Sequence, residues 1–162
     1  MKTLIAYYSR SGATRKVAEE LARVLHADLD EIRSGRSYRG LFGFLRGGRD
    51  SMRGYLPAIE PTAHAPADYD LVILAAPLWA GKAAPPIRTY LRAHKADIKR
   101  IGFVLTHNDS SPKQAFAELE TQAAMKPVAE AAILNRLIAH NQFELAVANF
   151  AGPIRVQEEA VF

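Results

Sequence analysis

The sequence of 162 residues contains no cysteine. The chain can therefore form no disulfide, and it has neither a thiolate nucleophile nor a ligand for an iron–sulfur cluster. Long apolar runs are missing too, since no segment approaches the ~18 apolar residues of a membrane-spanning helix. Met1 and Lys2 are followed directly by an apolar strand pattern, without the features of a signal peptide. We expect a cytoplasmic protein built as one domain.

Residue patterns typical of metal binding and of hydrolysis are also absent. The five histidines show no spacing of metal ligands, and no G-x-S-x-G segment occurs. No paired acid and base residues stand out. The sequence therefore predicts neither a metal site nor a catalytic side chain.

Positive charge is concentrated in one segment, residues 33–55. This segment has Asp50 as its only acidic residue, whereas the whole chain has a net charge of +4. Its arginines are Arg33, Arg36, Arg39, Arg46, Arg49 and Arg53. The segment is either a solvated helical face or a binding surface for an acidic partner, a dinucleotide phosphate or an anionic membrane. Nucleic acid is not expected, because no matching motif occurs and the charge excess is small.

Short apolar runs alternate with segments of helical periodicity. Strands are predicted at 3–8, 28–33, 71–76 and 101–106, with a fifth inside 128–138. Helices are predicted from Thr14, at 85–94, 112–125 and 143–150, and an amphipathic helix within 38–55 is weakened by three glycines. This alternation predicts a parallel sheet with helices on both faces, formed by residues 1–152 and followed by a poorly ordered tail at 153–162.

The first strand is followed by a polar loop that precedes a helix. The loop reads Ser9-Arg10-Ser11-Gly12-Ala13-Thr14 and combines three hydroxyl groups, a glycine and the first free N–H groups of the helix. A helix N-terminus offers N–H donors and a positive dipole end, which suits a phosphate group. The alternative is an ordinary strand–helix turn with Thr14 as the N-cap.

Two more loops are expected at the same edge, because ligands of open doubly wound sheets bind outside the carboxyl ends of the strands. The loop Pro77–Ala84 contains Trp79, the only tryptophan, close to Gly81. An indole in this position suits stacking on a flat aromatic ligand. The alternative is that Trp79 folds back as a local hydrophobic plug.

The loop Thr106–Ser111 follows the fourth predicted strand and is rich in hydrogen-bonding groups. The alternative to a binding role is a helix N-terminal turn capped by Ser110 or Ser111. His107 is the only histidine at this edge, and it is either a proton donor at the site or a surface residue. The three loops together predict a phosphorylated planar ligand.

These loops resemble those of the flavodoxin-like family, and the resemblance extends over residues 1–150. The first loop matches the family's [S/T]-x-[S/T]-G-x-[T/S] phosphate loop in full, and Pro77-Leu78-Trp79-Ala80-Gly81 matches its P-x-[W/Y]-x-G loop. Flavodoxin is a standard example of the strand order 2-1-3-4-5 with FMN at the switch point. The resemblance therefore implies a three-layer αβα fold with a five-stranded parallel sheet of this order, and FMN as cofactor.

The resemblance also implies which residues bind FMN. The phosphate would be held by Ser9, Arg10, Ser11, Gly12, Ala13 and Thr14. The isoalloxazine would be lined by Pro77, Leu78, Trp79, Ala80 and Gly81, and by Thr106, His107, Asn108 and Asp109. The third loop departs from the family, because many relatives have a glycine pair where this chain has His107 and Asn108.

Two classes of function follow. In the first, the chain is an FMN-dependent oxidoreductase or electron carrier that passes electrons to a redox partner protein, exchanges them with NAD(P)H or reduces a quinone-like substrate. A protoporphyrinogen-oxidase-like enzyme is a variant of this class. In the second class, the fold binds no flavin and is an interaction module. The basic segment Arg33–Arg53 would raise the reduction potential of a nearby flavin and attract an acidic partner or an anionic surface.

Overall fold

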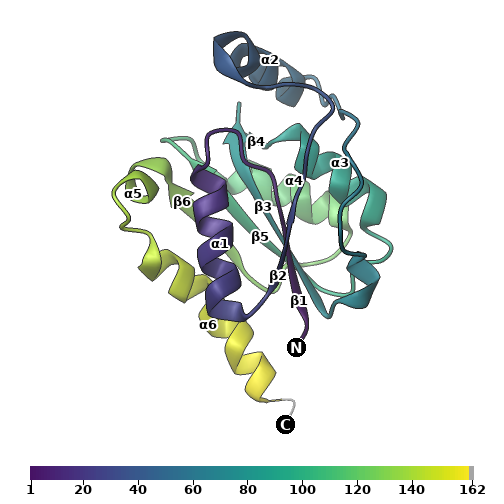
Figure 1. Cartoon of the computed structure of the whole chain (residues 1–162), viewed down its shortest axis with the longest axis vertical. Helices are drawn as coiled ribbons and strands as arrows, with labels where there is room; N and C mark the ends of the chain where they lie inside the picture. The colour runs from purple at the N-terminus through teal and green to yellow at the C-terminus, as the bar shows by residue number, and fades with distance from the viewer. Residues whose placement is uncertain (161–162) are drawn as a thin grey trace.

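Five parallel strands form the centre of the protein, as the computed structural model of residues 1–160 shows (Figure 1). They are β1 (Thr3–Tyr7), β2 (Asp28–Glu31), β3 (Leu71–Trp79), β5 (Ile101–His107) and β6 (Glu130–Leu134). Their order is β2-β1-β3-β5-β6, and the short β4 (Lys82–Ala83) pairs antiparallel with β3. With β4 set aside, this is the predicted order 2-1-3-4-5, so the predicted fold class is confirmed.

Helices cover both faces of the sheet (Figure 1). One face is covered by α1 (Ala13–Leu25), α5 (Asn135–Ala139) and α6 (Glu144–Glu159), and the other by α3 (Pro85–His94) and α4 (Lys113–Ala123). The strand β1 and the first six residues of β3 are buried throughout, because both of their faces meet helices. This burial explains why these two segments read as continuous apolar runs.

Two further elements lie outside the two helical layers. The helix α2 (Gly40–Met52) stands beyond the carboxyl ends of the strands, next to the hairpin of β3 and β4 (Figure 1). A 3-10 turn, η1 (Pro66–Asp68), leads into β3. Among residues 1–160, no helix is long and apolar enough to cross a bilayer.

The fifth predicted strand is shorter than expected. β6 ends at Leu134, and Leu137 and Ile138 belong to α5 instead. The reason lies in the register: Leu134 pairs with His107, the last residue of β5, so no strand remains to pair with the residues beyond. Ile138 instead turns into the apolar layer beside α1 and α6.

The predicted tail is wrong for residues 153–159. The helix α6 runs through Pro153 to Glu159, although proline removes a helical N–H donor. Burial compensates, since Ala151 and Ile154 on either side of the proline are almost completely buried against the sheet layer. Residues 161–162, which the predicted tail also included, lie outside the described residues.

Candidate functional site at the carboxyl edge of the sheet

The three predicted loops meet at one edge of the sheet. The hydroxyl oxygens Oγ1 of Thr14 and Thr106 lie 2.8 Å apart and are hydrogen-bonded, so the start of α1 is tied to the end of β5. The rings of Tyr8 and Trp79 are in edge-to-face contact with centroids 5.6 Å apart, which ties the first loop to the β3–β4 hairpin. The predicted convergence of these loops is confirmed.

The first loop forms an open helix N-terminus. Gly12 is the N-cap of α1 with a φ of 95°, a conformation that glycine adopts without strain. Its N–H donates to Ser9 Oγ (3.0 Å), and its carbonyl accepts the first helical bond, from Lys16 N–H (3.1 Å). The N–H groups between them have no acceptor within the helix. A Cβ at Gly12 would meet no atom within 4 Å, so the space in front of the loop is free.

Thr14 does not cap α1, so the alternative of an ordinary turn capped by Thr14 is wrong. Its hydroxyl is buried and bonded to Thr106, and Gly12 occupies the N-cap position without any side-chain cap. Because the Thr14 hydroxyl already has a protein partner, the N–H groups of the loop are the donors available to a ligand. The hydroxyls at the mouth of the loop belong to Ser9 and Ser11.

A basic cavity opens in front of this helix N-terminus. Its volume is about 760 Å³, and it lies between the first loop and the segment 31–39. Two acidic residues, Glu31 and Glu60, also line it, and Glu31 forms an ion pair with Arg15. The arginines of the wall are Arg10, Arg15, Arg33, Arg36 and Arg39. This excess of guanidinium groups beside a helix N-terminus favours an anionic ligand.

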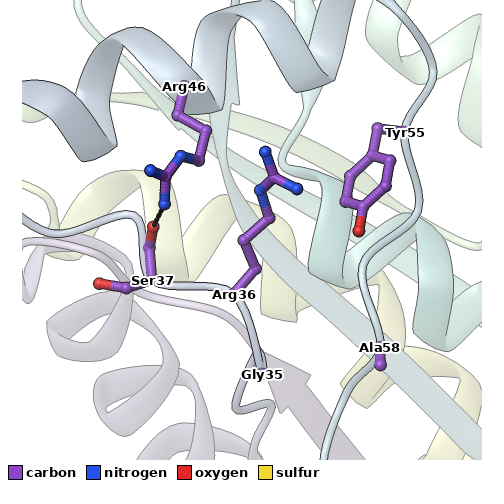
Figure 2. Close-up of a pocket in the computed structure, with 6 residues that line it drawn as sticks. All are labelled: Gly35, Arg36, Ser37, Arg46, Tyr55 and Ala58. Carbon is purple, nitrogen blue, oxygen red and sulfur yellow. Dashed lines mark hydrogen bonds between the residues drawn. The ribbon is translucent and has the colours of Figure 1, made fainter.

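A second cavity of about 540 Å³ adjoins the first and shares Gly35, Arg36 and Ser37 with it (Figure 2). Arg46 Nη1 of α2 donates to the carbonyl of Ser37 (3.2 Å), and the Arg36 guanidinium lies over the Tyr55 ring, 4.7 Å from its centroid. Figure 2 shows the side chains of Arg36 and Arg46 between α2 and the chain of residues 35–37. Part of the basic segment therefore faces this edge of the sheet.

The predicted loop Pro77–Ala84 is in fact a tight hairpin. β3 continues to Trp79, and the turn is made by Ala80 (φ 49°) and Gly81 (φ 77°). Two successive positive φ angles are typical of a type I′ turn, whose twist matches that of the paired strands. Lys82 Nζ in β4 donates to Glu118 Oε1 in α4 (2.6 Å), which anchors the hairpin to the helical layer.

Trp79 is half-buried in a cluster of aromatic rings beneath α2. The Tyr38 ring lies 5.1 Å from the indole at an inclination of 60°, beside the edge-to-face contact with Tyr8. The indole also lies so close to Gly47 that a Cβ there would come within 2.9 Å of Cε3 and Cζ3. The alternative of a hydrophobic plug is therefore right in that the indole is packed against other residues. It is wrong about the place, because the indole packs against α2 and not within its own loop.

The polar inner side of α2 holds Tyr38 beside the indole. The Tyr38 hydroxyl donates to Asp50 Oδ2 (3.0 Å), and Arg36 Nε lies 3.0 Å from the same buried carboxylate. Burial, with the hydrogen bond to Asp50, raises the pKa of Tyr38 well above its ordinary value. Burial likewise raises the pKa of Tyr8 to about 12. Both phenols therefore stay neutral hydrogen-bonding groups at physiological pH.

The third loop contains buried polar atoms that have no partner. His107 is half-buried, and its Nδ1 has no hydrogen bond. Asn135, the first residue of α5, donates from Nδ2 to Asn108 Oδ1 (3.0 Å), while its own Oδ1 is buried and unpaired. Buried polar atoms are rarely left unpaired in native proteins, so both point to a ligand or an ordered water. Asp109 is exposed.

Sequence reasoning missed Asn135, Tyr38 and Gly47 as parts of this edge. Asn135 directly follows the last parallel strand, and this is the signal in the sequence that could have placed it at the carboxyl edge. The alternative of a turn capped by Ser110 or Ser111 is wrong, because Pro112 is the N-cap of α4 and no side chain caps this helix.

An open parallel sheet of this strand order, with three loops meeting at its carboxyl edge, defines the doubly wound class of α/β folds. Comparison with family models gives the family directly: the model described as flavodoxin matches residues 2–150. The chain therefore belongs to the flavodoxin family, as the first and second loops predicted. Comparison with curated proteins gives no significant match.

Solved flavoproteins share the fold. A flavoprotein from Lactobacillus acidophilus NCFM in complex with FMN is 23% identical and covers 86% of this chain and 97% of its own, with a TM-score of 0.66. The apo form of the flavoprotein from the same organism is 26% identical over 82% of this chain and 90% of its own, with a TM-score of 0.61. A flavodoxin from Streptococcus pneumonia TIGR4 is 16% identical, with coverage of 97% and 99% and a TM-score of 0.61.

Proposed function

We propose that this protein binds FMN at the carboxyl edge of its sheet and acts as an oxidoreductase or electron carrier. The observation that carries the proposal is the open N-terminus of α1, where Gly12 faces a basic cavity. Membership of the flavodoxin family supports FMN as the cofactor, and so does the FMN in the Lactobacillus flavoprotein, which has the same fold.

The first loop fits the phosphate of FMN. The free N–H groups after Gly12 and the hydroxyl of Ser11 would donate to it, and the hydrogen bond from Gly12 to Ser9 keeps the loop in place. Arg10, exposed on the rim, would add a cationic contact. Thr14 would contribute its N–H, because its hydroxyl is bonded to Thr106.

The second and third loops fit the two sides of an isoalloxazine. Trp79 is held by Tyr8, Tyr38 and Gly47, so its indole is a rigid platform on which a flat ring can stack. We place the flavin between the hairpin Pro77–Gly81 and the loop Thr106–Asp109. The unpaired Nδ1 of His107 would then hydrogen-bond to the polar edge of the ring.

Bound FMN would supply the electron transfer, by exchanging one or two electrons. The protein's own contribution is position and electrostatics. The arginines of the cavity beside the first loop, Arg10 and Arg36 among them, would favour the negatively charged state of a flavin bound at this edge and so raise its reduction potential. Electron transfer itself needs no positioned acid–base pair.

The electron acceptor is inferred from a second cavity. The cavity of Figure 2, which adjoins the proposed phosphate site, is walled by Arg36, Arg46 and Tyr55. Such a wall suits a substrate that combines an apolar body with carboxylates, and this favours a protoporphyrinogen-like substrate over an uncharged quinone as the alternative to a protein partner. A screen of the FMN-loaded protein with NADH, NADPH, quinones and protoporphyrinogen distinguishes these choices by the rate of flavin reduction or reoxidation.

Binding of FMN is tested by titrating the apoprotein with FMN and with riboflavin, which lacks the phosphate. We expect FMN to bind about tenfold or more tightly, because only FMN can use the helix N-terminus. Ser9→Ala should reduce this preference, since Gly12 N–H loses its acceptor, whereas Ser111→Ala, at an exposed position of the third loop, should not. Equal affinity for the two flavins would overturn the phosphate site, and no affinity for either would leave the fold as an interaction module.

A further inference from the structure

The helix α2 has its large apolar side chains on the outside. Five of them are exposed in the structure, to between 54% and 83% of their surface: Leu41, Phe42, Phe44, Leu45 and Met52. The residues that α2 buries are instead small or polar: Gly43, Gly47, Asp50 and Ser51. Exposed apolar residues clustered on one element are unusual in a monomeric protein and mark an interaction surface.

Close contacts prevent α2 from turning this face inward. A Cβ at Gly43 would lie 2.2 Å from the carbonyl carbon of Tyr38, and a Cβ at Gly47 would lie 2.9 Å from the indole of Trp79. Asp50 adds a buried hydrogen bond from the Tyr38 hydroxyl (3.0 Å). Rotation of the helix would force leucine and phenylalanine side chains into positions where only glycine fits. The outward face is therefore a fixed property of the fold.

Arginines surround the apolar residues of α2. Arg39 precedes the helix, Arg46 and Arg49 lie within it, and Arg53 follows it. The only acidic residue of the helix, Asp50, is buried and forms ion pairs with Arg36 (3.0 Å) and, more distantly, with Arg49 (3.8 Å). Phe42, Leu45, Arg46 and Arg49 together line a shallow depression of about 290 Å³, where apolar and basic groups adjoin. The exposed surface of α2 thus combines apolar chains with positive charge only.

We propose that α2 lies on the surface of an anionic lipid bilayer. The apolar side chains would enter the boundary between headgroups and acyl chains, and the arginines would contact lipid phosphates. A protruding convex helix suits a bilayer, which accepts side chains anywhere along its surface, better than a protein partner, which would need a matching groove. With 13 residues α2 is too short to span a membrane, so it would lie in the plane of the interface.

Docking by α2 would bring the carboxyl edge of the sheet close to the membrane. The helix lies beyond this edge (Figure 1) and contacts Trp79 through Gly47. The membrane proposal gives the proposed function a location. It does not depend on that function, because the side chains that would contact the bilayer are not residues of the proposed flavin site.

The test is sedimentation of the full chain with vesicles of phosphatidylcholine alone and of phosphatidylcholine mixed with phosphatidylglycerol. We expect binding to the mixed vesicles only, with an affinity that falls as salt is raised. The double variant Phe42→Ser/Leu45→Ser should bind about tenfold or more weakly, since two inserted side chains are lost. Arg49→Glu/Arg53→Glu should weaken binding as well.

A matched control is available on α6, where Leu145 and Val156 are exposed to 74% and 65%. The double variant Leu145→Ser/Val156→Ser should bind mixed vesicles as the unaltered protein does. FMN titration of every variant gives a separate readout, so failure of the flavin proposal is distinguishable. Absence of binding to mixed vesicles would overturn the proposal, as would equal losses in the two double variants. Self-association through α2 that abolishes vesicle binding would overturn it as well.

Discussion

Replacing Gly47 by alanine tests the packing of α2 on Trp79. An alanine Cβ would lie 2.9 Å from both Cε3 and Cζ3 of the indole, closer than nonbonded carbons come. The indole cannot move away freely, because the rings of Tyr8 and Tyr38 hold it at centroid distances of 5.6 and 5.1 Å. Either the helix must shift outward or the aromatic cluster must rearrange.

The neighbouring glycine provides the control. A Cβ at Gly48 would meet no atom within 4 Å, and both residues lie inside the same helix. Alanine should therefore stabilise the helix by about 1 kcal/mol at either position through its higher helix propensity. At Gly47 alone, this gain is opposed by overpacking of about 1–3 kcal/mol. We expect Gly48→Ala to be the more stable variant by about 1–3 kcal/mol.

Urea unfolding of the two apoprotein variants measures this difference. For a chain of this size, it corresponds to a gap in melting temperature of roughly 2–12 °C. Trp79 is the only tryptophan, so its emission reports directly on the contact. Emission should shift to longer wavelength in Gly47→Ala, as the indole becomes more exposed, and stay unchanged in Gly48→Ala. Equal stability of the two variants, with equal emission, would refute the packing.

Three further outcomes are expected. Thr14→Val should destabilise the protein by about 1–2 kcal/mol, because it leaves Thr106 with an unpaired buried hydroxyl. The double variant Thr14→Val/Thr106→Val should recover part of this loss. Chemical unfolding measures both changes, and a double variant less stable than Thr14→Val would contradict the hydrogen bond. Gly12→Ala should cost about 1 kcal/mol of stability through its positive φ and weaken FMN binding, since the added methyl enters the space in front of the loop; unchanged FMN affinity would place the phosphate elsewhere. Because burial raises the pKa of Tyr8 to about 12, the unfolded chain loses this proton first, and stability should fall from about pH 10 upward; Tyr8→Phe should make the fall less steep, and an unchanged slope would contradict the burial.

The sequence predicted those parts of the fold in which large side chains mark the buried surface. Apolar runs identified β1, β3 and β5, and Gly12 between a strand and a helix identified the first loop. Parallel topology then placed the three loops at one edge, without any knowledge of their contacts. The Thr14–Thr106 bond confirms this placement and shows a link that no local pattern contains.

The inner side of α2 could not be predicted in this way. Hydrophobic periodicity is read from large side chains, and in α2 these point outward while Gly43 and Gly47 approach their neighbours. The glycines weakened the prediction of the helix, although they are the residues that allow it to dock. The end of α6 was missed for a different reason. Residues after Gly152 were expected to be poorly ordered because they lie at the end of the chain, but Ile154 is buried and the helix continues to Glu159.

The central claim is that FMN lies against Trp79 with its phosphate at the first loop. The most direct test is to titrate the apoprotein with FMN and to monitor tryptophan emission, because Trp79 is the only tryptophan and its emission reports on this contact alone. We predict that emission is strongly quenched at saturation and that riboflavin produces the same quenching only at higher concentration. Saturable FMN binding without a change in Trp79 emission would contradict the account, and so would an absence of binding.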